Sequence, residues 1–267
     1  MHTHRRLVAL AGVAALLLVG CAGDDPGDVA ASTSSTTVDS TTSSTALEDP
    51  TTSTSSTSTV PGPGASGCDS AEGPVPPTGA TDVSEVSADV DGDGAPDRVV
   101  AYREADGNRR VAVELAAGGT AAVDASESSI DGPAPLSVLG GVDLGGDGQT
   151  VLAVTSAGAS VVVVGLFQFV ECALARVSLE GGQPAELPVG GGVTHGDGLA
   201  CTDESLVRLS ATSTDGETFS TTDTRYRVDG NTLVEIGAES ATLTRGSDDA
   251  ELERYSTIDC PGLEREL

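Results

Sequence analysis

The residues best placed to do chemistry lie in one short acidic segment, Asp89–Asp97. Its aspartates stand at positions 89, 91, 93 and 97, so their carboxylates turn toward one centre when the segment coils. Calcium takes six to eight oxygen ligands, and Gly94 allows the sharp bend that such a loop needs. Val100 stands where an EF-hand loop has its bidentate Glu, so this is not an EF-hand. The spacing predicts a Ca²⁺ site completed by water, with these protein ligands: the carboxylates of Asp89, Asp91, Asp93 and Asp97, and the carbonyl of Ala95.

Two later segments repeat parts of this pattern. Asp143–Val151 keeps the first and fifth positions, but Gly145 and Val151 replace the carboxylates at the third and ninth, so tight calcium binding is not expected there. Val193–Cys201 keeps only Asp197. The Asp-Gly pairs at 93, 147 and 197 lie 54 and 50 residues apart, which indicates a repeat of several strands per unit. The alternative is that Asp-Gly pairs are simply common in this chain.

The pattern D-x-D-G-D-G-x-x-D followed by a Val-rich strand resembles the FG-GAP/VCBS repeats of integrin-like β-propellers. The resemblance covers Asp89–Val123 well and is weaker beyond. It implies a calcium loop that joins two strands of a propeller blade and stiffens the turn between them. A closed propeller has four or more blades. Three units therefore leave two alternatives: further blades without the motif, or an open, curved or sandwich-like array.

The chain beyond residue 80 is typical of an all-β protein. Short β-branched runs recur, as in 98–102, 111–115, 151–154, 161–164, 206–209 and 224–228. Turn signals such as Asp106-Gly107-Asn108 and Asp229-Gly230-Asn231 separate them. No segment offers a capped amphipathic helix of more than about one turn. We expect multi-stranded antiparallel repeats resembling incomplete propeller blades, with a core of Val, Leu and Ala.

The N-terminus has the features of an export signal. Arg5 and Arg6 precede the apolar stretch Leu7–Val19, which is too short to span a membrane but suits a signal peptide. Leu18-Val19-Gly20-Cys21 resembles the bacterial lipobox. The resemblance implies cleavage before Cys21, a diacylglycerol thioether on that residue and acylation of the new N-terminus. We therefore expect a lipid-anchored protein on the extracytoplasmic face of the cell membrane.

Composition divides the chain into four parts. Ser or Thr fills 21 of the 30 positions 31–60, which cannot bury enough apolar surface to fold. We therefore expect a signal peptide at 1–20, a lipidated and disordered stalk at 21–67, the all-β domain at 68–260 and a tail at 261–267. The formal net charge is −28, so nucleic acid is not an expected partner.

Four cysteines remain beyond the stalk, and an exported protein with an even number predicts two disulfides. Three pairings are possible. Cys172–Cys201 is favoured because it closes a local loop between neighbouring strands. Cys68–Cys260 would then join the two ends of the domain.

The inventory of side chains argues against most enzyme classes. The chain has no Lys and no Trp, which excludes a Schiff-base lysine and a tryptophan platform for sugars. His195 is the one histidine left after export, and a lone histidine in a Gly-rich turn is not predicted to be catalytic. Phe167 and Phe169 are predicted core residues. We expect a non-enzymatic protein that binds an envelope protein or glycan or supports the envelope; the alternative is a secreted, glycan-directed hydrolase with paired carboxylates.

Overall fold

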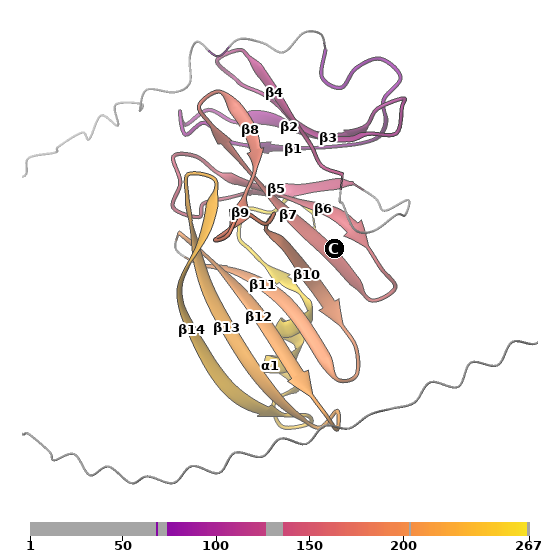
Figure 1. The fold of residues 1–267 in the computed structure, drawn as a ribbon, viewed down its shortest axis with the longest axis vertical. Coiled ribbons are helices and arrows are strands. Elements are labelled where there is room, and N and C mark those ends of the chain that lie inside the picture. Colours follow the sequence, from indigo (N-terminus) through magenta and orange to yellow (C-terminus); the bar gives the residue numbers. More distant parts are fainter. Residues whose placement is uncertain (1–67, 69–73, 127–135, 203, 266–267) are drawn as a thin grey trace, which may run out of the picture. The chain divides into compact units, whose positions relative to one another are not determined.

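The computed structural model describes residue 68 and residues 74–126, 136–202 and 204–265 (Figure 1). Most of these residues lie in β-strands, nearly all antiparallel, and one short α-helix occurs among them. The all-β prediction is therefore confirmed. The predicted signal peptide, Cys21 and the predicted stalk fall outside the described residues.

The first sheet is a four-stranded antiparallel meander in which consecutive strands pair in order. Its strands are β1 (Thr81–Ala88), β2 (Asp97–Arg103), β3 (Arg109–Glu114) and β4 (Thr120–Asp124). The predicted turn at Asp106-Gly107-Asn108 joins β2 to β3, and the backbone N–H of Asn108 donates to Asp106 Oδ1 at 3.1 Å. Short turns of this kind place neighbouring strands side by side.

The second sheet has the order β5-β6-β7-β10-β11-β12-β13-β14-β9, with β8 paired to β7 and β15 paired to β11. The strands are β5 (Ser137–Val142), β6 (Thr150–Ala157), β7 (Val161–Val170), β8 (Ala173–Arg176), β9 (Ser178–Leu179), β10 (Glu186–Gly191), β11 (His195–Thr202), β12 (Ser205–Ser213), β13 (Thr218–Asp229), β14 (Thr232–Thr244) and β15 (Ile258–Asp259). One edge of the long strand β7 is shared, since its first half pairs with β10 and its second half with β8. Strands β5–β8 thus repeat the strand order of β1–β4.

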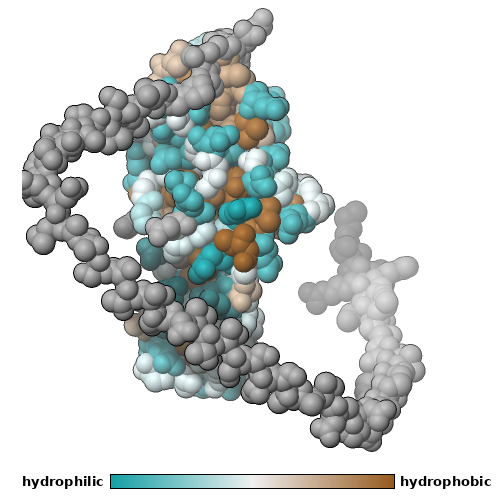
Figure 2. Space-filling model, turned by 90° about the vertical axis from the view of Figure 1, so that its left-hand side faces the viewer, coloured by the Kyte–Doolittle hydropathy of each residue, from teal (hydrophilic) through white to brown (hydrophobic). Residues whose placement is uncertain are grey.

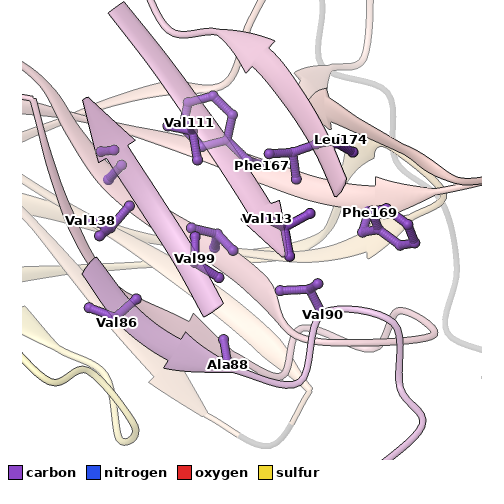
Figure 3. Close-up of a cluster of buried hydrophobic side chains, with 14 of the residues drawn as sticks. Val86, Ala88, Val90, Val99, Val111, Val113, Val138, Phe167, Phe169 and Leu174 are labelled. Atoms are coloured by element: carbon purple, nitrogen blue, oxygen red, sulfur yellow. The ribbon is translucent and has the colours of Figure 1, made fainter. Parts of the chain in front are cut away.

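The first sheet packs on one face of β5–β8, and apolar side chains from both fill the space between them (Figure 3). Val99 and Val113 come from the first sheet, and Val138 and Phe167 from the second, and all four are fully buried. Most members of this cluster are Val, Ala or Leu, as the composition predicted. Phe167 and Phe169 are core residues, which confirms that prediction.

Strands β5–β7 are buried on both faces, which explains why their sequences are nearly continuous runs of apolar residues. Val151 and Phe167 contribute to the core shared with the first sheet. Their neighbours in sequence, Leu152 and Leu166, lie in a second core with Leu206 of β12. Successive residues of a strand point to opposite faces. Strands β5–β7 therefore form the middle of three layers, with the first sheet on one face and the part of the second sheet around β12 on the other (Figure 1).

The third Asp-Gly segment is not a loop, and the prediction of a third repeat unit there is wrong. Asp197 and Gly198 lie inside β11, whose neighbour β12 pairs with it along its whole length. A Cβ at Gly198 would lie 2.1 Å from the carbonyl oxygen of Arg254, and one at Gly196 would lie 2.6 Å from that of Tyr255. These glycines admit the C-terminal helical turns, α1 (Asp249–Glu253) and η1 (Arg254–Ser256), against the sheet.

Two disulfides form, as predicted, but the favoured pairing is wrong. Cys68 bonds to Cys172 and Cys201 bonds to Cys260, with Cα–Cα distances of 5.3 and 4.5 Å. The reason is the parallel pairing of β15 with β11, which sets Asp259 beside Ala200 and so brings the two following cysteines together. Cys172 lies in the turn between β7 and β8, and Cys68 packs against the first core.

The described part of the predicted tail contacts the body of the domain. Leu263 forms a β-bridge with Gly140, and the N–H of Glu264 donates to the Leu139 carbonyl at 2.9 Å. Glu264 Oε1 also accepts from the N–H of Ser87 at 3.2 Å. Residues 261–265 therefore belong to the folded body.

The face drawn in Figure 2 mixes hydrophilic and apolar side chains. The large apolar residues that are strongly exposed in the described part are Val83, Val193 and Ile236. Within the same ranges, no helix has the length and apolar character needed to cross a membrane.

We predict that Phe167→Ala lowers the free energy of unfolding by about 3–5 kcal/mol, because it empties the centre of the first core. Val83→Ala, on an exposed side chain of β1, is the matched control and should cost less than about 1 kcal/mol. Urea unfolding followed by circular dichroism measures both. Equal losses in the two variants would contradict the proposed position of this core.

Candidate metal centre

The acidic loop joins β1 to β2, and the strand register closes it because Ala88 lies opposite Asp97. Val90 is fully buried in the first core and fixes the base of the loop. Gly92 and Gly94 have φ values of +72° and +87°, which only glycine adopts without strain. The loop is thus bent at its two glycines and fixed at both ends by the sheet.

Three of the predicted ligands come together in this loop. Asp89, Asp91 and Asp97 each offer a carboxylate oxygen, and these oxygens all lie within 4.8 Å of one another. Asp97 is buried, and the other two residues are half-buried. Asp89 Oδ1 and Asp91 Oδ2 are buried and have no hydrogen-bond partner among the described residues. An unpartnered buried carboxylate oxygen is costly, and a cation between these oxygens would remove that cost.

The remaining oxygens of the first two carboxylates shape the loop. Asp89 Oδ2 accepts from the N–H of Gly94 at 3.0 Å, and Asp91 Oδ1 accepts from the N–H of Asp93 at 3.2 Å. Each carboxylate therefore uses one oxygen to hold the backbone and keeps the other unpaired. The local fold itself creates the set of free oxygens.

Asp97 holds the loop to the rest of the first sheet. Its Oδ2 accepts from the N–H of Val90 and its Oδ1 from the N–H of Ala116, both at 2.8 Å. Burial raises the pKa of Asp97, these two hydrogen bonds oppose the rise, and the charges of Asp91 and Asp93 add to it. A cation would favour the ionised form of this crowded carboxyl.

Asp93, also a predicted ligand, is not part of the group of three. Its Oδ1 accepts from the N–H of Ala95 at 2.7 Å, so it shapes the next bend of the loop. The carbonyl of Ala95 stays a predicted ligand. No ion pair found among the described residues involves the carboxylates of this loop. Within the described residues, the negative charge of the loop is therefore not neutralised by an arginine ion pair.

The loop between β5 and β6 has the same place in the second sheet. Val142 lies opposite Thr150 there, as Ala88 lies opposite Asp97 in the first sheet. The second loop is therefore one residue shorter than the first. Thr150, and not Val151 as the sequence pattern suggested, stands where Asp97 stands.

A neutral hydrogen-bond network supports the second loop. Thr150 Oγ1 donates to Gln168 Oε1 at 2.6 Å, and Gln168 Nε2 donates to the Gly148 carbonyl at 3.4 Å. Gln168 is buried, and sequence reasoning gave it no role. The sequence could have indicated this role, because Gln168 stands between two phenylalanines predicted to lie in the core, and a buried amide needs hydrogen-bond partners. Asp143 and Asp147 form no group of metal-ligating side chains within the described ranges.

The two loops pack directly against each other. A Cβ at Gly92 would lie 1.7 Å from the carbonyl oxygen of Asp147, so only glycine fits there. The N–H of Gln149 donates to the Asp89 carbonyl at 2.7 Å, and the N–H of Asp89 donates to Gln149 Oε1 at 2.9 Å. Both backbone groups of the first predicted ligand are thus held by the second sheet.

A hollow of about 760 Å³ opens beside the loops. Its lining includes four acidic residues, Asp91, Asp147, Glu171 and Asp229. Asp91, a member of the carboxylate group, thus also lies in the wall of this hollow. His195, weighed in the sequence as a base, is exposed at the start of β11, and its imidazole makes no hydrogen bond within the described residues.

Comparison of the chain with protein-family models, curated proteins and solved structures found no match.

We predict that Gly92→Ala and Gly94→Ala differ sharply in their effect on stability. Both residues have positive φ, which costs about 1–2 kcal/mol for alanine, but the Cβ at Gly94 meets nothing within 4 Å. At Gly92 the collision with the Asp147 backbone should add at least about 2 kcal/mol. Thermal unfolding of the two variants measures the difference, and equal losses would show that the loops do not touch.

Proposed function

We propose that the chain is an exported lipoprotein, anchored to the extracytoplasmic face of a membrane through Cys21, that presents a calcium-stabilised β domain for binding. The calcium part rests on one observation: the unpartnered, buried oxygens of Asp89 and Asp91 lie beside the Asp97 carboxylate. The anchor and the stalk rest on the sequence of residues 1–67.

Calcium is the cation that best suits this donor set. The donors are carboxylate oxygens, and the group contains no His or Cys that would favour zinc. Calcium also accepts irregular coordination and water ligands, whereas magnesium demands near-ideal octahedral geometry. Extracellular calcium modules typically bind with Kd values of roughly 10⁻⁴–10⁻³ M. The proposed role is structural, because the loop fixes the contact between two sheets.

The paired sheets also support the proposed kinship with propeller blades. Strands β1–β4 and β5–β8 have the same antiparallel order, and each unit carries its Asp-Gly loop between its first two strands. The two units pack on each other, as neighbouring blades do. We propose that they are two repeats of the FG-GAP/VCBS type, followed from β10 onward by strands of a different arrangement.

Binding is preferred to hydrolysis as the proposed activity. A glycan hydrolase with paired carboxylates needs two acidic groups free to act on substrate. Among the described residues, the acidic side chains whose carboxylate oxygens lie within 4.8 Å of one another are the ones assigned to the cation. In this proposal the calcium loop stabilises the contact between the two sheets. The proposed partner of the domain is an envelope protein or glycan.

We predict that calcium at about ten times its Kd stabilises the domain by about 1.4 kcal/mol, which raises the melting temperature by roughly 3–6 °C. Asp91→Asn should abolish the rise, because it removes one of the two unpartnered oxygens. Asp106→Asn, in the exposed turn between β2 and β3, is the matched control and should keep it. Scanning calorimetry with calcium, magnesium and chelator decides the matter. Equal midpoints with calcium and with chelator would refute the site.

We predict that the full chain, expressed in a bacterial host, incorporates labelled fatty acid and fractionates with membranes. Cys21→Ala should lose the label and leave the membrane fraction. Cys201→Ser, which alters a disulfide cysteine, is the control and should keep the label. Label that persists in Cys21→Ala would rule out the anchor.

A further inference from the structure

The disulfide between Cys68 and Cys172 lies at the same end of the two sheets as the acidic loop. In a meander of antiparallel strands, the first and third connections lie at one end and the second at the other. The acidic loop between β1 and β2 therefore lies at the same end of the first sheet as the β3–β4 turn. In the second sheet, the β5–β6 loop and the β7–β8 turn, which contains Cys172, likewise share one end.

Cys68 lies against the turn between β3 and β4. A Cβ at Gly119 of this turn would lie 2.9 Å from the Cys68 carbonyl oxygen and 3.5 Å from the Cys68 Cβ. The N–H of Leu115 closes the turn by donating to the Gly119 carbonyl at 3.0 Å. The N–H of the next residue, Ala116, donates to Asp97 Oδ1 at 2.8 Å. One short turn thus connects Cys68 to a carboxylate of the proposed metal site.

Cys172 borders the acidic loop from the second sheet. It lines the hollow of about 760 Å³ together with Asp91 and Gly92. Asp91 belongs to the group of three carboxylates, and Gly92 is the residue that meets the backbone of Asp147 in the second loop. Both cysteines of this disulfide therefore lie close to parts of the loop that position its carboxylates.

Two kinds of contact therefore hold these ends of the sheets together. One is the non-covalent contact of the loops, in which Gln149 holds both backbone groups of Asp89. The other is the covalent bond between Cys68 and Cys172. If the bond is opened, the loops alone must keep this end closed, and arrangements in which Asp89 is not held become more populated. The apparent Kd of a ligand rises in proportion as the binding-competent fraction of the protein falls.

We infer that the Cys68–Cys172 disulfide sets the calcium affinity of the acidic loop, and that its reduction weakens calcium binding. The inference rests on the proposed function, because it concerns the regulation of the same site. Coupling between two sites is reciprocal. Bound calcium must therefore favour the oxidised form of this disulfide by the same factor by which the disulfide favours calcium.

Exposure makes this disulfide the more accessible of the two to a dithiol reductant. Cys172 is exposed and Cys68 is half-buried. In the other disulfide, Cys260 is buried and Cys201 is half-buried.

The reduction is an ordinary thiol–disulfide exchange. A thiolate of the dithiol attacks the sulfur of Cys172, the S–S bond breaks, and Cys68 leaves as a thiolate. The second thiol of the reductant then displaces the Cys172 thiolate and closes the reductant's own disulfide. Two electrons pass from the dithiol to the protein, and the two protons of the dithiol end on Cys68 and Cys172.

The first test compares the calcium Kd of full-length proteins by titration calorimetry, after circular dichroism has shown that each is folded. The variant that combines Cys68→Ser with Cys172→Ser removes the bond and should bind calcium at least about threefold more weakly than the wild type. The matched control combines Cys201→Ser with Cys260→Ser. It removes the disulfide at the second core and should leave the Kd unchanged.

The second test uses the wild-type chain, so it does not depend on the folding of a variant. The chain is equilibrated in mixtures of reduced and oxidised dithiothreitol, with saturating calcium or with chelator. Alkylation and mass spectrometry then give the oxidised fraction of each cysteine pair. Calcium should raise the equilibrium constant for oxidation of the Cys68–Cys172 pair by the same factor, about threefold or more. That of the Cys201–Cys260 pair should not change.

Three results would overturn the inference. The first is an unchanged Kd in the folded variant without the Cys68–Cys172 bond, and the second is an equal loss of affinity in both double variants. The third is a calcium effect on the redox equilibrium that is absent or is the same for both disulfides. If the wild type binds calcium, each of these results overturns this inference alone. A wild-type chain that binds no calcium would overturn the proposed metal site as well.

Discussion

The contact between the acidic loop and the loop of the second sheet both positions the carboxylates and joins the two sheets. Gly92 meets the Asp147 backbone so closely that no side chain fits between them, and Gln149 holds both backbone groups of Asp89. The carboxylates of the loop are therefore positioned by two sheets and not by the loop alone. A dication among them would reduce their mutual repulsion and so strengthen the contact between the sheets as well as the loop.

Much of the fold could be predicted because its signals are local. Alternating runs and Asp-Gly turns predict strands and hairpins directly. The Asp spacing also predicted correctly that Asp89, Asp91 and Asp97 lie together. The pairing of the cysteines could not be predicted. It depends on the short strand β15 lying parallel to β11, a contact between segments far apart in sequence. The Asp-Gly pair at Asp197 was wrongly predicted to mark a repeat loop for a similar reason. Gly198 is required there because the backbone of Arg254, far away in the sequence, packs closely against it.

The middle layer shapes the second loop, against which the acidic loop packs. Its strands are buried on two faces, and the buried side chains of Gln168 and Thr150 satisfy each other by a hydrogen bond. That network stands in the second loop where the first loop has carboxylates, so the one group of metal-ligating side chains found within the described residues lies in the first loop.

Amide hydrogen exchange of the full chain, with calcium and with chelator, tests directly whether a cation in the acidic loop strengthens the contact between the two sheets. We predict that calcium slows exchange at Gly94 and Ala95 in the first loop and, together with them, at Gln149 in the second loop. The N–H of Gln149 bonds to Asp89 across the contact, so it reports on the sheets and not on the acidic loop alone. Unchanged exchange at all three amides, or slowing that stops within the first loop, would contradict the claim.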